Sequence, residues 1–332
     1  MKIFISVASY RDILLATTLE SAYNNATYKD SLVFGVIDQS YASETLDLSA
    51  LAFNKQIRYV RVDPEYSRGT CWARHMAQTF YNEEDYYLQI DSHTIFDLGW
   101  DAYLINRLDE LREIHDKPII TGYTTAFQVV DGDIKNLKKS SKLEWCDAMI
   151  VVESQSFQQQ DFYIRIKGDH KKDVKTVHGF LVAGGFLFAI GSIVEEVPYD
   201  PYMYFHGEEQ SVALRAWTCG YSIFHIDNVP VYHHYNDPNA PLYDRLTPWA
   251  DKQIIEKKVT DRWYELEDMA KRRLVNLVTG QNLGVYSLGK NRTLQQYAEW
   301  SGIDYSNRTL NKNATTGEHT FSIPYQNQII IQ

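Results

Sequence analysis

The order of apolar and polar segments in this 332-residue chain predicts an α/β fold with a mostly parallel central sheet. Short apolar runs at 2–8, 32–37 and 56–62 are typical of strands, and residues 13–26 carry apolar positions at helical spacing. Parallel strands need crossover connections, which helices of this kind provide. Polar residues follow directly after the strands, where open α/β sheets bind their ligands.

The ends of the first two strands carry candidate ligand-binding residues. The first strand runs into Ser9, Tyr10 and Arg11, and the second ends at Asp38. Because these positions lie just beyond the carboxyl ends of neighbouring strands, we expect their side chains at one edge of the sheet.

The third strand leads to a helix predicted at 70–80. Gly69 permits a tight turn before this helix, and Arg74 lies one turn inside it. An arginine near a helix N-terminus is a plausible contact for a diphosphate or a ribose. The simpler alternative is that Arg74 pairs with a surface carboxylate.

The most informative stretch is 86–100. An apolar run at 86–90 predicts a buried strand, and Asp91, Ser92 and His93 follow it at once. A carboxylate and an imidazole two residues apart on extended backbone point to the same side and can bind one ion. Such a mixed pair suits Mn²⁺ best and leaves Mg²⁺ or Zn²⁺ open. Alternatively, Asp91 caps a turn and His93 is an ordinary surface histidine.

The middle of the chain contains an elaborated region and a glycine pair. After a helix at 101–115 and a strand at 118–123, residues 129–173 are mixed and polar, which predicts a loop or hairpin region able to carry acceptor specificity. An apolar strand predicted at 180–189 contains Gly184 and Gly185. Adjacent glycines indicate close approach of another group to the backbone, such as a sugar, or a bend in the sheet.

Two carboxylates begin the next helix. Glu208 and Glu209 precede a helical pattern at 210–219, where they either interact favourably with the helix dipole or accept hydrogen bonds from sugar hydroxyls. Short strands at 221–226 and 229–232 then lead to a pair of histidines.

The histidine pair offers a third metal ligand. His233 and His234 are neighbours on a predicted strand edge, so their side chains face opposite ways and at most one of them reaches the ion.

The pattern changes beyond Pro248. Residues 252–278 are charged and largely helical, and 280–332 are rich in Gly, Asn and Thr. We therefore predict a catalytic domain at 1–247 and an extension at 248–332 that packs on it or closes over the site.

Composition narrows the class of partner. The chain is 44% hydrophobic with a net charge of −10 and no long basic run, so it is a poor candidate for binding nucleic acid or anionic membrane. No apolar run is long enough to span a bilayer, and the N-terminus enters a strand at once, which leaves no room for a signal peptide. Three widely spaced cysteines predict reduced thiols. We expect a cytoplasmic protein.

Several groups of residues occur in an order that resembles the cytoplasmic GlcNAc-transferases that modify hydroxyproline on a ubiquitin-ligase adaptor protein. They are Ser9-Tyr10-Arg11-Asp12, Gly69 through Arg74, Leu88 through His93 with Trp100-Asp101, Val197 through Pro201, Gly207-Glu208-Glu209 with Arg215 and Trp217, and Tyr286 through Gly289 with Arg292-Thr293. The Asp-Ser-His triplet, the glycine pair and the Gly-Glu…Arg-x-Trp spacing are also similar to the mucin-type polypeptide GalNAc-transferases.

The resemblance implies a GT-A type nucleotide-sugar-binding fold and a metal-dependent, retaining transfer of a sugar to a hydroxyl acceptor on a protein or glycan. The implied donor is a UDP-sugar, UDP-GlcNAc by default, and the implied cation is Mn²⁺ or Mg²⁺. By the same resemblance the metal ligands are Asp91, His93 and His233, with His234 as the alternative to His233. Asp91, Glu208 and Glu209 are the implied catalytic residues. The donor contacts implied by the resemblance are Tyr10, Arg11, Arg74, Gly184 and Gly185. Their position just past a strand adds Ser9, Asp38 and Asp91 to the predicted donor contacts.

Two other functions remain compatible with the sequence. One is a transferase that acts on a glycan or a hydroxylated nucleobase, although the acidic charge balance counts against a nucleobase. The other is a non-catalytic sugar-binding protein on a degenerate transferase fold. Slow metal-dependent hydrolysis of a UDP-sugar would separate an enzyme from this second class.

Overall fold

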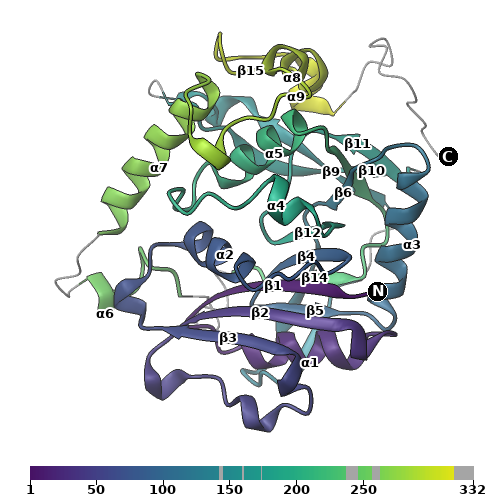
Figure 1. The fold of residues 1–332 in the computed structure, drawn as a ribbon, viewed down its shortest axis with the longest axis vertical. Helices are drawn as coiled ribbons and strands as arrows, with labels where there is room; N and C mark the ends of the chain where they lie inside the picture. The colour runs from purple at the N-terminus through teal and green to yellow at the C-terminus, as the bar shows by residue number, and fades with distance from the viewer. Residues whose placement is uncertain (142–144, 159–160, 173, 237–245, 256–261, 318–332) are drawn as a thin grey trace.

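The structure, a computed structural model, describes residues 1–141, 145–158, 161–172, 174–236, 246–255 and 262–317. An eight-stranded sheet forms its centre, with helices on both faces (Figure 1). In spatial order the strands are β11 (Thr176–Gly179), β13 (Ser222–Ile226), β6 (Pro118–Thr121), β12 (Phe186–Ile190), β4 (Tyr86–Asp91), β1 (Ile3–Tyr10), β2 (Leu32–Gln39) and β3 (Ile57–Val62).

Most of this sheet is parallel. Strands β3, β2, β1 and β4 run side by side in one direction, and β13 is parallel to β6. Strand β12 is antiparallel to both of its neighbours, and β11 is antiparallel to β13. The predicted α/β class with a mostly parallel sheet is therefore confirmed.

Five helices connect or flank these strands. They are α1 (Leu15–Asn25), α2 (Thr70–Gln78), α3 (Trp100–Arg112), α4 (Ile193–Glu196) and α5 (Glu208–Thr218). The side chains of β1 show why both faces are covered, because alternate residues of a strand point to opposite sides. Ile3 and Ile5 lie in the apolar cluster that includes residues of α1 and α3, whereas Phe4 lies in the cluster that includes residues of α5. The strands and helices predicted before residue 125 are present, with ends shifted by at most three residues.

A second sheet brings distant segments together. Its strands are β5 (Thr94–Phe96), β14 (Val231–His233), β7 (Thr125–Val129) and β8 (Leu137–Lys139). Strand β14 pairs antiparallel with β5, so that His233 lies opposite Thr94, and the backbone N–H of His234 donates to the carbonyl of His93 at 3.0 Å. This pairing places position 233 beside position 93.

The region predicted as a loop or hairpin at 129–173 contains an antiparallel pair, β9 (Trp145–Val152) and β10 (Arg165–Lys172). The next prediction, a strand over 180–189, is wrong in part. Strand β12 begins only at Phe186, and Gly184 and Gly185 form the turn that precedes it. The two glycines therefore do not lie inside a strand, and they do not bend one.

The C-terminal segment packs against the rest of the chain. Its elements are α6 (Lys252–Ile255), α7 (Trp263–Val278), α8 (Leu294–Ser301), β15 (Ile303–Asp304), β16 (Thr309–Leu310) and α9 (Lys312–Thr316). Figure 1 shows α7 along the left-hand side of the molecule. Leu274 and Val278 of α7 belong to the main apolar cluster, and Arg273 Nε donates to Asp200 Oδ2 at 2.7 Å. The domain boundary at residue 247 stays a prediction, and part of the helix predicted at 252–278 lies outside the described residues.

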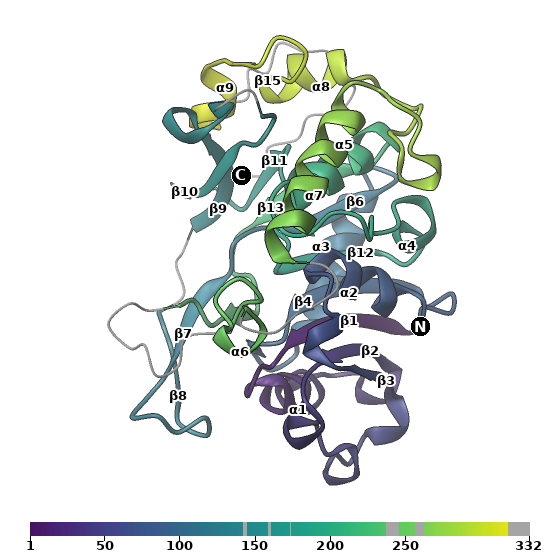
Figure 2. The same ribbon diagram turned by 90° about the vertical axis from the view of Figure 1, so that its left-hand side faces the viewer.

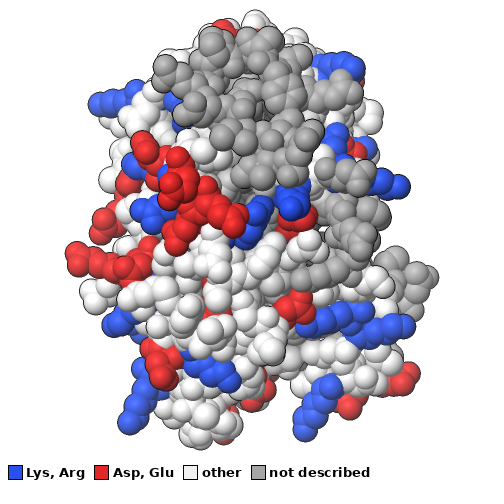
Figure 3. Space-filling model, turned by 90° about the vertical axis from the view of Figure 1, so that its right-hand side faces the viewer, with Lys and Arg blue, Asp and Glu red and all other residues white. Residues whose placement is uncertain are grey.

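The surface carries side chains of both charges. On the α3 side of the molecule, Lys and Arg side chains are interspersed with Asp and Glu side chains (Figure 3). Within the described ranges, no helix is long and apolar enough to cross a membrane. The three cysteines are free thiols, as the sequence predicts.

Candidate active site

A cavity of 340 Å³ opens at the carboxyl ends of β1 and β4. Its lining includes Tyr10 from the end of β1, Asp91 from the end of β4 and His233 from the end of β14. Figure 2 views the molecule from this side. The position is the one at which open α/β sheets bind ligands.

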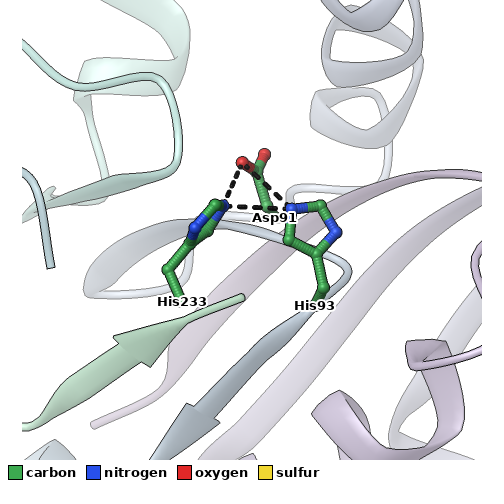
Figure 4. Close-up of side chains that lie close together, drawn as sticks. All are labelled: Asp91, His93 and His233. Carbon is green, nitrogen blue, oxygen red and sulfur yellow. Dashed lines mark hydrogen bonds and ion pairs between the residues drawn. The ribbon is translucent and has the colours of Figure 1, made fainter. Parts of the chain in front are cut away.

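Three potential metal ligands meet in this cavity. The side chains of Asp91, His93 and His233 point toward one another from three different strand ends (Figure 4). His233 Nε2 lies 3.2 Å from Asp91 Oδ2 and 3.0 Å from His93 Nε2, and His93 Nε2 lies 3.7 Å from Asp91 Oδ2. His234 turns the other way, toward the carbonyl of Phe127 at 3.3 Å. The structure thus brings His233, and not His234, to the aspartate.

These separations fit a bound divalent cation. Ligand atoms about 2.1 Å from one ion, at octahedral or tetrahedral angles, lie roughly 3.0–3.4 Å from each other. The two shorter distances fall within this range, and the third is slightly longer. One carboxylate and two imidazoles also form the mixed oxygen and nitrogen donor set that suits Mn²⁺. The residues present therefore fit the metal that the sequence predicts.

A second carboxylate orients His93. Asp12 Oδ2 lies 2.6 Å from His93 Nδ1 and accepts a hydrogen bond from Ser92 Oγ at 2.7 Å. Burial raises the pKa of Asp12, but attraction to His93 and these hydrogen bonds outweigh it and hold the pKa below its usual value. An ionised Asp12 can only accept, so His93 carries its proton on Nδ1. Its Nε2 lone pair is then directed toward Asp91, the arrangement that metal-binding histidines use.

Arg74 adjoins the group formed by Asp91, His93 and His233, called the metal-type cluster below, and is almost completely buried. Its Nη2 donates to Asp91 Oδ1 at 2.6 Å, and its Nη1 forms an ion pair with Glu208. Burial disfavours an ionised Asp91, yet its interactions with the neighbouring His233 and His93, together with the charge of Arg74, hold its pKa well below the usual value. Arg74 also lines the cavity, and its contact with a nucleotide stays a prediction; in the structure its guanidinium pairs with two protein carboxylates.

The Glu208 carboxylate belongs to the same buried network. Tyr199 Oη donates to Glu208 Oε1 at 2.8 Å, and Cys71 Sγ lies 3.3 Å from Glu208 Oε2. Gln89 Nε2 donates to Tyr199 Oη and to the carbonyl of Gly184, both at 2.7 Å. With both oxygens engaged, Glu208 is placed to support the cavity floor.

The glycine pair lies against these polar groups. A Cβ atom at Gly184 would stand 2.8 Å from both Arg74 Nη1 and Glu208 Oε1, and one at Gly185 would stand 2.9 Å from Asp91 Oδ2. The sequence predicted close approach to the backbone at these positions. The approaching groups in this structure are the protein's own charged side chains.

Glu209 lines the cavity and is mostly, but not completely, buried. Among the described residues it accepts one hydrogen bond, from Gly184 N at 2.9 Å, which leaves its second oxygen available. Burial, assisted by the nearby charges of Glu208 and Asp91, raises the pKa of Glu209 to about 7, although the Gly184 hydrogen bond and Arg74 act in the opposite direction. Of the two adjacent glutamates, Glu209 is therefore the one open to a ligand.

The predicted nucleoside contacts lie where the C-terminal segment meets β1. Tyr10 lines the cavity, and its Oη donates to Asp251 Oδ2 at 3.1 Å. Arg11 does not line it; Arg11 Nη1 donates to the same Asp251 oxygen at 2.7 Å, and its other nitrogens bind Glu44. The side chain of Asp251 thus ties the C-terminal segment to the end of β1.

Ser9 and Asp38 are also outside the cavity lining. Ser9 is fully buried, and Asp38 is buried and accepts a hydrogen bond from Tyr59 Oη at 2.6 Å. The structure does not bring these two side chains to the metal-type cluster, and their contact with a nucleotide stays a prediction.

Sequence reasoning assigned no role to Asp12, Gln89 or Tyr199. A weak signal existed for each: Asp12 closes the motif after β1, Gln89 is a polar residue within an apolar strand, and Tyr199 lies in the segment at 197–201 that carried part of the resemblance. None of these signals identifies the partner of the side chain, because the contacts join residues far apart in the chain.

The fold is that of a GT-A glycosyltransferase. The chain belongs to the glycosyltransferase (GlcNAc) family, whose model matches residues 2–53 and 40–307. Comparison with curated protein sequences finds no match.

A solved structure shows the same fold. The crystal structure of GalNAc-T7 with UDP, GalNAc and Mn²⁺ superposes with a TM-score of 0.58 at 14% identity, covering 93% of this chain and 58% of that chain. This chain thus spans less than two thirds of the length of GalNAc-T7. A structure of residues 1–349 of S. aureus TarS in complex with UDP gives a TM-score of 0.47 at 12% identity, covering 92% of this chain and 80% of that one.

Proposed function

We propose that this glycosyltransferase moves a sugar, GlcNAc by default, from a UDP-sugar to a hydroxyl group of an acceptor, with a divalent cation and with retention of anomeric configuration. The observation that carries the proposal is the convergence of Asp91, His93 and His233 in the cavity at the sheet edge. The family match supports GlcNAc only through its description, and GalNAc-T7 binds UDP and Mn²⁺ in its own crystal structure.

Each group of residues has a separate role in this proposal. A cation held by Asp91, His93 and His233 would neutralise the diphosphate and act as a Lewis acid on the leaving group. Arg74 keeps Asp91 ionised and in place. The available oxygen of Glu209 is positioned to stabilise positive charge that develops on the donor sugar.

The direct test is a donor panel with released UDP as the readout. The purified chain is incubated with UDP-GlcNAc, UDP-GalNAc or UDP-glucose, in Mn²⁺, Mg²⁺ or EDTA. We expect slow UDP release from at least one donor, greatest with Mn²⁺ and absent in EDTA. UDP release from no donor under any metal condition would contradict the proposal.

Replacing Glu209 with glutamine is expected to lower kcat for donor turnover by about 10²-fold, the usual effect of removing one group that stabilises transition-state charge. KM for the donor should change much less. The control is Glu195→Gln, at an exposed position of α4 outside the cavity lining. Equal kcat values in the two variants would remove Glu209 from the mechanism.

Replacing Asp12 with asparagine is expected to weaken Mn²⁺ binding by roughly 10–100-fold, because partners that orient a ligating histidine contribute about that much to metal affinity. The asparagine amide can donate to Nδ1 of His93 and so favour the tautomer that blocks Nε2. Mn²⁺ affinity is measured by titration calorimetry, with circular dichroism to show that the fold is retained. Ser92→Ala removes one hydrogen bond to Asp12 but leaves the contact between Asp12 and His93, and should cost far less. Unchanged affinity in folded Asp12→Asn would contradict this role.

A further inference from the structure

A second cavity, of 690 Å³, lies directly beside the first. Six residues line both cavities: Gly122, Tyr123, Thr124, Arg165, Ile166 and Tyr235. Because the two spaces share a wall, a molecule in the second cavity would lie next to the metal-type cluster.

Within this wall, Tyr235 contacts one of the three potential metal ligands. Its ring packs against His233 with centroids 4.3 Å apart, and its Oη donates to the carbonyl of Thr124 at 2.9 Å. Tyr235 therefore contacts His233, a potential metal ligand, and also lines the second cavity. A hydroxyl group presented past Tyr235 would reach the donor site.

The second cavity is locally basic in an acidic protein. Arg165 and Lys167, which line it, lie two residues apart on β10, so their side chains point to the same side of the strand. Neither forms an ion pair with an acidic side chain of the described chain. The one carboxylate in the described lining, Asp147, lies 3.4 Å from His170 Nδ1. With a net charge of −10 for the whole chain, two unpaired cations on one cavity wall indicate an anionic occupant.

The shape of the wall favours an extended peptide. The consecutive β10 residues 165–168 all line the cavity, although alternate side chains of a strand point opposite ways, so the cavity runs along the edge of the strand. In the described chain β9 is the only strand that pairs with β10. A strand edge of this kind binds extended peptides through main-chain hydrogen bonds. Hydroxyl side chains on the other walls, among them Thr125 and Ser140, add polar partners.

We propose that this second cavity is the acceptor site, and that it binds an acidic, hydroxyl-bearing peptide segment whose carboxylates pair with Arg165 and Lys167. The inference rests on the proposed transferase function and adds to it the location of the acceptor and its charge. A volume of 690 Å³ lies in the usual range for a specific ligand site, about 300–1,000 Å³.

The test uses synthetic peptides with a central serine, threonine or 4-hydroxyproline flanked by Asp and Glu, by Ala and Gly, or by Lys and Arg. They are incubated with the full chain, Mn²⁺ and the donor that gives UDP release, and transfer is detected by mass spectrometry. We expect preference for the acidic set. Lys167→Glu should lower kcat/KM for the acidic peptides about tenfold, which corresponds to roughly 1.4 kcal/mol, and should improve transfer to the basic set. UDP release without peptide should stay unchanged.

The matched control is Lys55→Glu, an equal charge change at an exposed position outside both cavities. Two results would overturn the inference while leaving the transferase function intact, provided that UDP is released. One is equal use of all peptide sets. The other is the same kcat/KM for the acidic peptides in Lys167→Glu and Lys55→Glu. Transfer to oligosaccharides and to none of the acidic peptides would overturn it too. Absence of UDP release in every condition would instead refute the proposed function.

Discussion

Asp91→Asn is expected to reduce metal-dependent turnover of the UDP-sugar by ~1,000-fold or more. The substitution keeps the shape of the side chain but removes the only anionic ligand of the three-residue cluster. A bound metal ion contributes several kcal/mol of transition-state stabilisation, and each ~1.4 kcal/mol changes the rate about tenfold. Turnover is measured as initial rates of UDP release at saturating Mn²⁺.

The matched control for this variant is Asp109→Asn, at an exposed position of α3 where the carboxylate pairs with Arg112. Its turnover should equal that of the wild type. Full metal-dependent activity in Asp91→Asn would show that the cation, if one is used, is held elsewhere.

Arg74→Met is expected to lower the free energy of unfolding by about 3–5 kcal/mol, the usual effect of removing one partner from a buried ion pair. Arg74 neutralises Glu208 in the protein interior and also binds Asp91, so its loss leaves buried negative charge without compensation. Chemical denaturation followed by tryptophan fluorescence gives the change in stability.

Two comparisons separate this explanation from a general effect of losing arginine. Arg112→Met removes an exposed ion pair and should cost at most about 1 kcal/mol. Adding Glu208→Gln to Arg74→Met removes one uncompensated charge and should restore part of the lost stability. Equal losses for Arg74→Met and Arg112→Met would contradict the buried network.

The sequence predicted those parts of the molecule that depend on local pattern. The apolar run before Asp91 forms a strand that ends at the sheet edge, and the predicted meeting of His93 with Asp91 is seen, although Ser92 and His93 lie in a bend between β4 and β5 and not on extended backbone. The argument that only one of two adjacent histidines reaches the ion also agrees with the structure, in which His233 approaches Asp91 and His234 does not.

The sequence did not predict the pairings that depend on tertiary contacts. The position of Arg74 one turn into a helix predicted a nucleotide contact, which stays a prediction, but it did not predict that Glu208 and Asp91, from other elements, pair with its guanidinium. Gly184 and Gly185 predicted that some group comes close to the backbone. They did not predict that this group is a charged side chain of the protein itself. No local pattern relates Asp12 to His93, because the folding of the sheet brings the ends of β1 and β4 together.

The central claim is that one cation binds between the aspartate and the two histidines and holds the donor diphosphate. Anomalous diffraction at the manganese edge, from crystals grown with Mn²⁺ and UDP, tests it most directly. We expect a single peak at bonding distance from Asp91, His93 and His233, with UDP phosphate oxygens completing the coordination. A complex with UDP bound in the cavity and manganese bound away from these three side chains, or not bound at all, would contradict it.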